Sequence, residues 1–366
     1  MTSDYPLSST CSMFTQPEIP KLSDLSIDQK IAQMLLIGFR GYELDDDNPI
    51  ISDLRELQIG GIILFDYDVV LKAFVRNVKS PEQLNHLVGQ LYSHMTMATF
   101  MSIDQEGGTV NRLKPEYGFE PTFSHVELGQ KDDLKLTEDH GRHIARILKQ
   151  YGINLNFAPC LDLAINKQNK AIFGRNRTFS DDPTKVAHHG AAYIRGHRAE
   201  SVLSCVKHFP GHGSSLEDTH LGMADVTDSW SEFEMYPYEH IIEEGLCDMV
   251  MTTHIFNRKL DEKYPATMST KIMQGILRDK LGYEGVIISD DLQMNAITHH
   301  FGLEDAVKQT ILAGVDVLAF GNNLAFEPDI AQRSIQIVKD LLDDGILDES
   351  RIDLSVKRIL KTKELI

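Results

Sequence analysis

The sequence predicts an α/β protein built as a single (β/α)8 barrel of the TIM type. Eight short runs of β-branched and apolar residues alternate with longer amphipathic stretches, an order typical of parallel strands joined by helices. The composition does not change along the chain, which favours one closed barrel over an open, doubly wound sheet. The 366 residues are sufficient, because such barrels commonly need about 250.

Each predicted element rests on a local pattern. The stretch 80–95 is predicted as a helix, with Ser80 as its N-cap and Pro81 at its first position. Residues 351–366 are predicted as a basic amphipathic terminal helix. We predict an N-terminal tail over residues 1–20 and a barrel domain over residues 21–366. The predicted strands are Ala32–Phe39, Ile59–Phe65, Thr99–Ile103, Asn154–Pro159, Val202–Val206, Asp248–Thr253, Gly285–Ser289 and Val315–Phe320.

Composition excludes several classes of function. No apolar run reaches the roughly 18 residues of a membrane span, so we expect a soluble, cytoplasmic protein that does not bind a membrane. A formal charge of -18 would repel phosphate backbones, so no nucleic-acid partner is expected. The cysteines lack C-x-x-C spacing, so we expect neither a disulfide framework nor a metal site, and a reducing compartment. They are Cys11, Cys160, Cys205 and Cys247.

Polar residues cluster directly after four of the predicted strands. In barrels of this kind the catalytic groups lie at the carboxyl ends of the strands. Charged groups are costly beside a packed core unless they are paired or used, so we predict that these clusters share one rim. The four clusters are Asp104–Arg112, CLDL (Cys160–Leu163) followed by Phe173–Pro183, Lys207–His220 and Asp290–Met294.

Two acids follow the seventh predicted strand. Asp290 and Asp291 are adjacent, so their side chains point to opposite faces and only one can face the barrel axis directly. Asp291 also fits the N-cap of the following helix. Asp290 is then the candidate nucleophile.

The segment KHFPGHGSSLEDTH is predicted as a shaped loop that begins where the strand Val202–Val206 ends. Pro210 and Gly211 exclude a regular helix, and with it a helical metal-binding histidine pair. Asp218 could hydrogen-bond to His220 and orient its imidazole for proton transfer. The alternative is a turn held by an Asx-type hydrogen bond, with the histidine merely exposed.

Together these segments resemble glycoside hydrolase family 3, specifically its β-N-acetylglucosaminidases with a single barrel domain. The resemblance runs from LSIDQKIAQMLLIGFRG through DQEGGTVNRL, NLNFAPCLDL, GRNRTFSDDP and GVIISDDLQM to RIDLSVKRIL, and so covers nearly the whole chain. The element KHFPGHG followed by Asp-x-His is highly specific to that subgroup, whereas GVIISDD is moderately specific.

The resemblance implies roles for individual residues. Asp290 matches the catalytic nucleophile, His220 the general acid/base, and Asp218 the partner that holds the histidine. Because FGRNRTF contains both Arg175 and Arg177, the assignment of the second rests on the Thr-Phe that follows it. The implied substrate contacts are Asp104, Arg112, Arg177, Lys207 and His208.

The activity that the resemblance implies is a retaining exo-β-N-acetylglucosaminidase. It would remove terminal β-linked N-acetylglucosamine through a covalent glycosyl–aspartate intermediate, in the recycling of peptidoglycan muropeptides. The expected partner is a small carbohydrate, an N-acetylglucosaminyl oligosaccharide or muropeptide, with no cofactor and no metal. The oligomeric state is open, and a monomer is compatible with the sequence.

Three other activities are weighed against this one. Phosphorolysis at the same site is the nearest, because a histidine acid/base repels phosphate less than a carboxylate does. A metal-dependent amidohydrolase is disfavoured, since the first predicted strand ends in GFRG instead of a His-x-His ligand pair. A non-catalytic sugar-binding barrel would lack Asp290 or the Asp218–His220 pair, and both are present.

Overall fold

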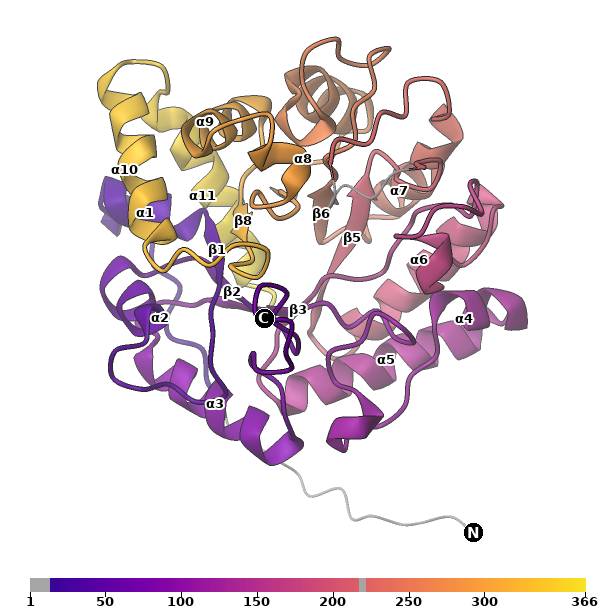
Figure 1. Ribbon diagram of the computed structural model, residues 1–366, viewed down its shortest axis with the longest axis horizontal. Helices are drawn as coiled ribbons and strands as arrows, with labels where there is room; N and C mark the ends of the chain where they lie inside the picture. The colour runs from indigo at the N-terminus through magenta and orange to yellow at the C-terminus, as the bar shows by residue number, and fades with distance from the viewer. Residues whose placement is uncertain (1–13, 217–221) are drawn as a thin grey trace.

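The computed structural model describes residues 14–216 and 222–366, and within them eight parallel strands form a barrel surrounded by helices (Figure 1). The order β7-β6-β5-β4-β3-β2-β1-β8 places each strand beside its neighbours in the sequence. The predicted fold class is therefore confirmed. The strands are β1 (Leu35–Gly38), β2 (Gly61–Leu64), β3 (Phe100–Ile103), β4 (Leu155–Asn156), β5 (Leu203–Phe209), β6 (Met249–Thr252), β7 (Val286–Ile288) and β8 (Leu318–Phe320).

The barrel is nearly closed at both sides of β8. On one side Leu36 of β1 lies opposite Ala319 in parallel register. On the other side Ile288 of β7 forms a parallel bridge with Val317, and the Ser289 amide donates to the Val317 carbonyl at 2.9 Å. Seven of the predicted strands contain an observed one and the eighth, Val202–Val206, overlaps β5, because short β-branched runs between helical stretches are a strong pattern.

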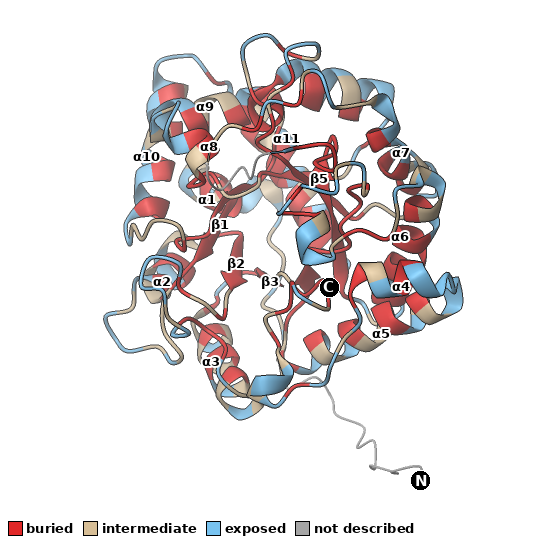
Figure 2. Cartoon of the chain, turned by 45° about the vertical axis from the view of Figure 1, so that its right-hand side comes forward, coloured by how far each residue is buried: buried red, intermediate tan, exposed pale blue. Residues whose placement is uncertain are grey.

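Helices cover the outside of the barrel, and Figure 2 shows buried strands at the centre with exposed outer helix surfaces. The prediction of Ser80 as an N-cap is confirmed, because its side chain accepts from the Gln83 amide. The terminal helix begins two residues earlier than predicted, since Asp348 caps it. The helices are α1 (Ile27–Gln33), α2 (Pro49–Ser52), α3 (Pro81–His94), α4 (His125–Lys131), α5 (Leu134–Gln150), α6 (Pro183–Arg198), α7 (Tyr236–Glu243), α8 (Asn295–Thr298), α9 (Leu303–Ala313), α10 (Ile330–Asp343) and α11 (Glu349–Lys363).

Short helical turns join these elements. Two of them are π-helical, at Asp53–Leu57 and Lys271–Lys280. The 3-10 turns are Leu22–Asp24, Pro115–Tyr117, Phe173–Arg175, Glu232–Met235 and Ala266–Met268. In the described ranges, no helix is both long and apolar enough to pass through a bilayer.

Strand β5 is longer than predicted, and this corrects the expected loop. It continues past Val206 to Phe209, which pairs with Thr252 of β6 after a shift in register. The charge on Lys207 argued against a strand, but two carboxylates neutralise it in the fold. Pro210 follows directly and cannot continue the ladder, because it has no N–H to donate.

Helices α5 and α6 approach each other closely through two glycines. A Cβ on Gly141 would lie 2.5 Å from the Tyr193 carbonyl oxygen, and one on Gly196 would lie 2.3 Å from that of Glu138. Either distance is far inside van der Waals contact, so only glycine allows this packing. The pair holds the outer wall of the barrel beside β4 and β5, where site residues lie.

A buried acid fixes the junction between β7 and β8. The Oδ2 atom of Asp316 accepts from the Ile287 amide at 2.9 Å and from Arg278 at 2.7 Å. Its Oδ1 atom accepts from Ser355 at 2.6 Å and from Arg358 at 3.2 Å. One carboxylate therefore connects the closing strands to α11.

The last helix also reaches the amino end of the barrel. The ammonium of Lys363 donates to the Gln33 side chain at 2.8 Å and to the Ala98 carbonyl at 2.6 Å. Burial lowers the pKa of Lys363 to about 7. The contacts join α11 to α1 and to the segment that leads into β3.

A second buried acid, Asp53, lies at the start of a π-helical turn. Unlike Asp316, it has few contacts. It is 2% exposed, and its Oδ1 atom has no hydrogen-bond partner among the described residues. Burial raises the pKa of Asp53 from 3.8 to about 7, because ionisation would leave a poorly solvated charge.

We expect Asp53→Asn to stabilise the protein by an amount that grows as the pH rises from about 4 to about 7 and then stays constant. A carboxyl whose pKa is raised on folding costs stability as the pH rises from its unfolded pKa of 3.8 to its folded pKa of about 7, because only the unfolded state is ionised over that range. At pH 8 the variant should gain about 2 to 4 kcal/mol in the free energy of unfolding, and the gain should vanish near pH 4. Urea unfolding at both pH values tests this, with the exposed Asp343→Asn as control. An equal gain at the two pH values would contradict it.

Candidate active site

A buried ammonium lies at the centre of the polar cluster. The Nζ atom of Lys207, on β5, lies 2.6 Å from Asp104 Oδ1 and 2.8 Å from Glu106 Oε1. The Lys207 side chain is only 2% exposed. Burial alone would lower the pKa of Lys207, but the two carboxylates outweigh it and raise that pKa. The group is therefore a permanent cation in the barrel mouth.

Arg177 is the second buried cation. Its Nε and Nη2 atoms donate to the two oxygens of Glu106 at 3.0 and 2.8 Å, the fork geometry of a strong arginine–carboxylate pair. Burial would raise the pKa of Glu106, but Arg177 and Lys207 hold it well below its ordinary value. Arg175 is exposed on the preceding 3-10 turn. Of the two arginines in FGRNRTF, Arg177 is the one in the cluster.

His208 is fixed between an acid and an arginine. Its Nδ1 atom lies 2.6 Å from Asp162 Oδ2, and its Nε2 atom lies 3.1 Å from Nη2 of Arg177. Because an arginine can only donate, Nε2 accepts and the ring hydrogen is on Nδ1. Asp162 also accepts from the His212 amide at 2.7 Å. The imidazole is thus held in one orientation and one tautomer.

Cys160, Asp162 and His208 lie close enough together to be considered as metal ligands, with one donor atom of each within 4.8 Å of the others. Their donor atoms are already committed to hydrogen bonds. The Cys160 thiol donates to Asp162 at 3.2 Å, and burial raises the pKa of that thiol well above its ordinary value. Both nitrogens of His208 are bonded as described above. The trio therefore fits a hydrogen-bond network better than a cation site.

Arg112 extends the cluster toward β2. Its Nη2 atom lies 3.3 Å from Asp104 Oδ2, and its Nη1 atom lies 4.0 Å from Asp66 Oδ1. Asp66, 1% exposed, also binds Lys114 and accepts from the Tyr117 hydroxyl at 3.2 Å. Acids and bases alternate along this side of the mouth, so each charge has an opposite neighbour.

The two acids after β7 differ in their surroundings. The Asp291 carboxylate accepts from the Gln293 amide at 3.0 Å, and it lies against Gly321, where a Cβ would be 2.5 Å from its Oδ2 atom. The expected N-cap role of Asp291 is not found, because Met294 occupies the N-cap of α8. Asp291 stabilises the turn before that helix instead. Asp290 Oδ1 accepts from the Asp291 amide at 2.8 Å.

The described half of the loop after β5 is closely packed. A Cβ on Gly213 would lie 2.1 Å from the Leu163 carbonyl oxygen, and one on Gly211 would lie 2.5 Å from the Glu234 side chain. Glu234 also accepts from the Ser214 amide at 3.2 Å, and burial raises its pKa to about 7. These glycines therefore serve close packing of the shaped loop that the sequence predicts.

Five of the predicted site residues form one network of contacts, namely Asp104, Arg112, Arg177, Lys207 and His208. Asp290 lies at the end of β7, on the same side of the barrel as the ends of β3 and β5. Asp218 and His220 lie outside the described residues.

Sequence reasoning gave no individual role to three acids of the network, Glu106, Asp162 and Asp66, although the first two lie in the predicted polar clusters. Each follows a strand by two to six residues, so the strand-end rule could also have included Asp66, which follows β2. The pattern alone did not distinguish them from capping or exposed acids.

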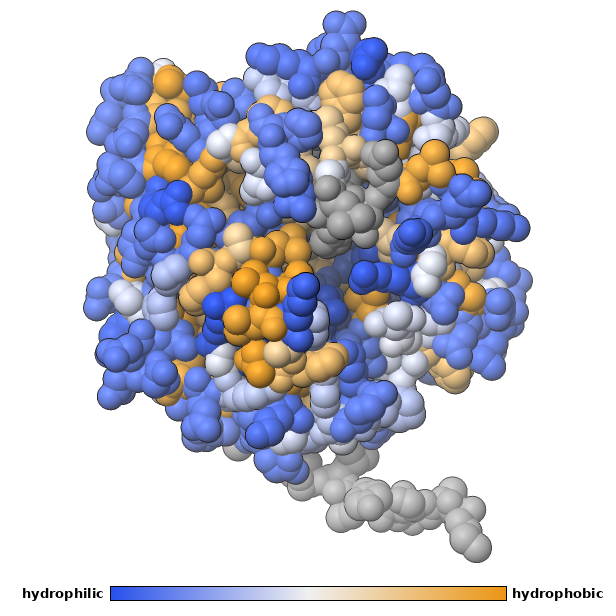
Figure 3. Space-filling model, viewed as in Figure 1, coloured by the Kyte–Doolittle hydropathy of each residue, from blue (hydrophilic) through white to orange (hydrophobic). Residues whose placement is uncertain are grey.

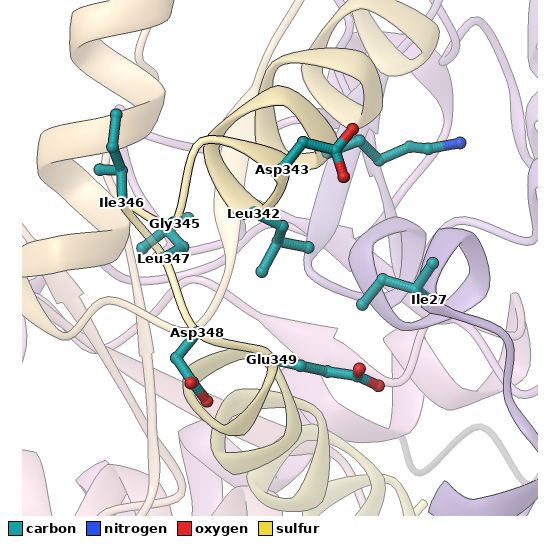
Figure 4. Close-up of a pocket in the computed structure, with 9 residues that line it drawn as sticks. Ile27, Leu342, Asp343, Gly345, Ile346, Leu347, Asp348 and Glu349 are labelled. Atoms are coloured by element: carbon teal, nitrogen blue, oxygen red, sulfur yellow. The ribbon is translucent and has the colours of Figure 1, made fainter.

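A separate cavity of about 580 Å³ lies between α1, α10 and α11, away from this network (Figure 4). Its polar side chains already serve the fold. Asp348 caps α11, Glu349 pairs with Lys30 at 2.9 Å, and Lys339 pairs with Asp28 at 2.9 Å. None of the predicted site residues lines it.

Known proteins resemble the chain along nearly its whole length. The model described as the glycosyl hydrolase family 3 N terminal domain matches residues 26–362. A β-hexosaminidase of Tolumonas auensis is 32% identical over 294 residues, which are 80% of this chain and 83% of that protein. The β-hexosaminidase A of Pseudoalteromonas piscicida is 32% identical over 93% of this chain, which spans 61% of that protein's length.

Solved structures agree with this. A family 3 β-N-acetylglucosaminidase from Paenibacillus sp. str. FPU-7 has a TM-score of 0.84 at 32% identity, covering 93% of this chain and 62% of its own. A β-N-acetylhexosaminidase from Beutenbergia cavernae, at 24% identity and a TM-score of 0.81, shows the same fold over 99% of its chain. On the evidence of the match over residues 26–362 and of these relatives, the chain belongs to glycoside hydrolase family 3.

Proposed function

We propose that this protein is a retaining exo-β-N-acetylglucosaminidase, and that residues 21–366 form its catalytic domain. The observation that carries the proposal is the buried network around Lys207 at the carboxyl ends of the strands, on the same side as Asp290. The relatives named above are β-hexosaminidases and a β-N-acetylglucosaminidase, which supports the choice of sugar.

The network is suited to hold a sugar ring by its hydroxyl groups. Asp104 can accept hydrogen bonds, whereas Lys207 and Arg112 can donate them, so vicinal hydroxyls can be bound as donors and acceptors together. Because each charged group is already positioned by its neighbour, little ordering remains when the ligand binds. Glu106 and Asp162 act as positioning residues for Lys207, Arg177 and His208.

The proposed reaction has two displacement steps. In the first, an oxygen of the Asp290 carboxylate attacks the anomeric carbon, the glycosidic C–O bond breaks, and His220 gives its proton to the leaving oxygen. In the second, His220 takes a proton from water, the water oxygen attacks the same carbon, and the bond to Asp290 breaks. Asp218 would orient the imidazole in both steps. The assignments of His220, Asp218 and Asp290 rest on the family resemblance.

We further propose a biological role in the recycling of peptidoglycan muropeptides in the cytoplasm, as the resemblance implies. The direct test of activity compares an aryl β-N-acetylglucosaminide with the aryl β-glucoside. Product analysis with and without inorganic phosphate separates hydrolysis from phosphorolysis. Preference for the glucoside would overturn the proposed sugar, and a sugar phosphate as product would overturn hydrolysis.

Asp290→Asn should lower kcat by about three orders of magnitude or more while the fold is retained, because an amide cannot form the covalent intermediate. Steady-state rates and circular dichroism measure this. Asp291→Asn is the comparison, since that residue stabilises a turn. An active Asp290→Asn beside an inactive Asp291→Asn would move the nucleophile to Asp291.

Lys207→Met should lower kcat/KM by about 30- to 1000-fold, because it removes a charged contact to the sugar and leaves Asp104 and Glu106 without their shared cation. The exposed Lys361→Met on α11 is the matched control. Unfolding curves identify any loss due to misfolding. Wild-type efficiency in a folded Lys207→Met variant would exclude this network as the sugar site.

His220→Ala should lose far more efficiency on a disaccharide than on a nitrophenyl glycoside. An alkoxide must be protonated to depart, whereas nitrophenolate leaves nearly unaided. The second step still needs a base, so the variant should show a burst of nitrophenol followed by slow turnover. Asp218→Ala should show the same pattern more mildly. Equal losses on both substrates without a burst would remove His220 from the acid/base role.

A further inference from the structure

The loop between β2 and α3 forms a tight hairpin with an exposed apolar surface. The Asp68 amide donates to the Ala73 carbonyl at 2.8 Å, and the Ala73 amide donates to the Asp68 carbonyl at 3.2 Å. Five side chains on this hairpin are exposed by 40% to 55%, and together they are called the hairpin patch. They are Val69, Val70, Leu71, Phe74 and Val75.

The hairpin is held rigidly from below. The Asp68 carboxylate is fully buried and pairs with Arg40 at 2.7 Å and with Arg76 at 3.4 Å. Arg76 in turn donates to the carbonyls of Gly321 and Asn322, after β8. The exposure of the patch is therefore a built feature and not the result of a loose loop. Orange side chains gather near the middle of the face seen in Figure 3, as expected for such a patch.

The patch is continuous with the proposed sugar site. Asp66 lies between β2 and the hairpin, and its carboxylate pairs with Arg112 and Lys114. The Lys114 ammonium lies 4.9 Å from the centre of the Phe74 ring. The rings of Tyr67 and Tyr117 flank Phe74, with centroids at 4.9 and 6.4 Å. An aromatic platform thus begins where the ion network ends.

We propose that the hairpin patch binds the aglycone, the part of the substrate that leaves, by stacking the C–H face of its first sugar ring on Phe74 with Leu71 beside it. This inference rests on the proposed function. An exo-acting site buries the terminal sugar in the ion network, so the next ring must lie at the rim. A pyranose ring presents an apolar face of C–H groups, and an exposed, rigid aromatic ring matches that face without an ordering cost.

The chemistry of the neighbours favours this occupant. The exposed Lys72 lies on the hairpin itself and the exposed Lys79 follows it by four residues in the sequence, in a protein with a formal charge of -18. They and Lys114 can donate hydrogen bonds to the hydroxyl, acetamido or carboxylate oxygens at the edge of a bound ring. The patch therefore offers an apolar face with polar donors around it, the usual composition of a sugar subsite.

The test uses two substrates with equally poor alkoxide leaving groups, the β-1,4 disaccharide of N-acetylglucosamine and methyl β-N-acetylglucosaminide. Phe74→Ala and Leu71→Asn should raise KM for the disaccharide by about 3- to 30-fold, with kcat changed less than about twofold, because a uniform binding contact is lost. Both parameters should stay near wild type on the methyl glycoside, which has no second ring. Leu354→Asn, an exposed leucine on α11, is the matched control.

The outcomes separate this inference from the proposed function. Unchanged KM for the disaccharide, or an equal rise on both substrates, would overturn the aglycone site while wild-type activity upholds the enzyme. A wild-type protein that cleaves neither substrate would overturn both. Light scattering is measured on the same variants, since a dimer that Leu71→Asn dissociates would assign the patch to a second copy of the chain and overturn the inference.

Discussion

The ion pair between the Lys207 ammonium and the carboxylates of Asp104 and Glu106 is the constraint on which the rest of the site depends. A charge this deeply buried is tolerated only when its partners are fixed, and they come from the segment after β3 while the lysine comes from β5. Arg112, Arg177 and His208 are each held by one of these carboxylates or by a neighbour of them. The ion pair thereby fixes the carboxyl ends of β3 and β5, which are not neighbours in the sheet, at the same level along the barrel axis.

The strands were predictable because a parallel barrel repeats one simple pattern, a short β-branched run before a helix. The end of β5 was not predictable, because a charged residue such as Lys207 is expected in a loop unless its tertiary ion-pair partners are known. The same limit applies to Glu106 and Asp162, whose importance comes from residues about 70 and 46 positions away. Lys207 and His208 were identified through a family motif, and the contacts that position them are tertiary.

The described parts of the site are held rigidly on both sides of the barrel mouth. The network that would bind the sugar lies on strands and their first turns, where hydrogen bonds and close glycine packing fix the backbone. The rim toward β2 is equally firm, because the buried Arg76 joins the hairpin to the segment after β8. A ligand bound on either side of the mouth would therefore require little rearrangement of these side chains.

Closure of the barrel has a consequence for folding during synthesis. The first strand pairs with the last, and Lys363 contacts Gln33 across 330 positions of the chain. At a synthesis rate of about 5 to 20 residues per second, β1 waits for roughly 15 to 60 seconds before β8 emerges. During that time one edge of a growing parallel sheet is open to neighbouring chains. The synthesis of β8 thus decides whether the earlier strands close into a barrel or pair with other chains.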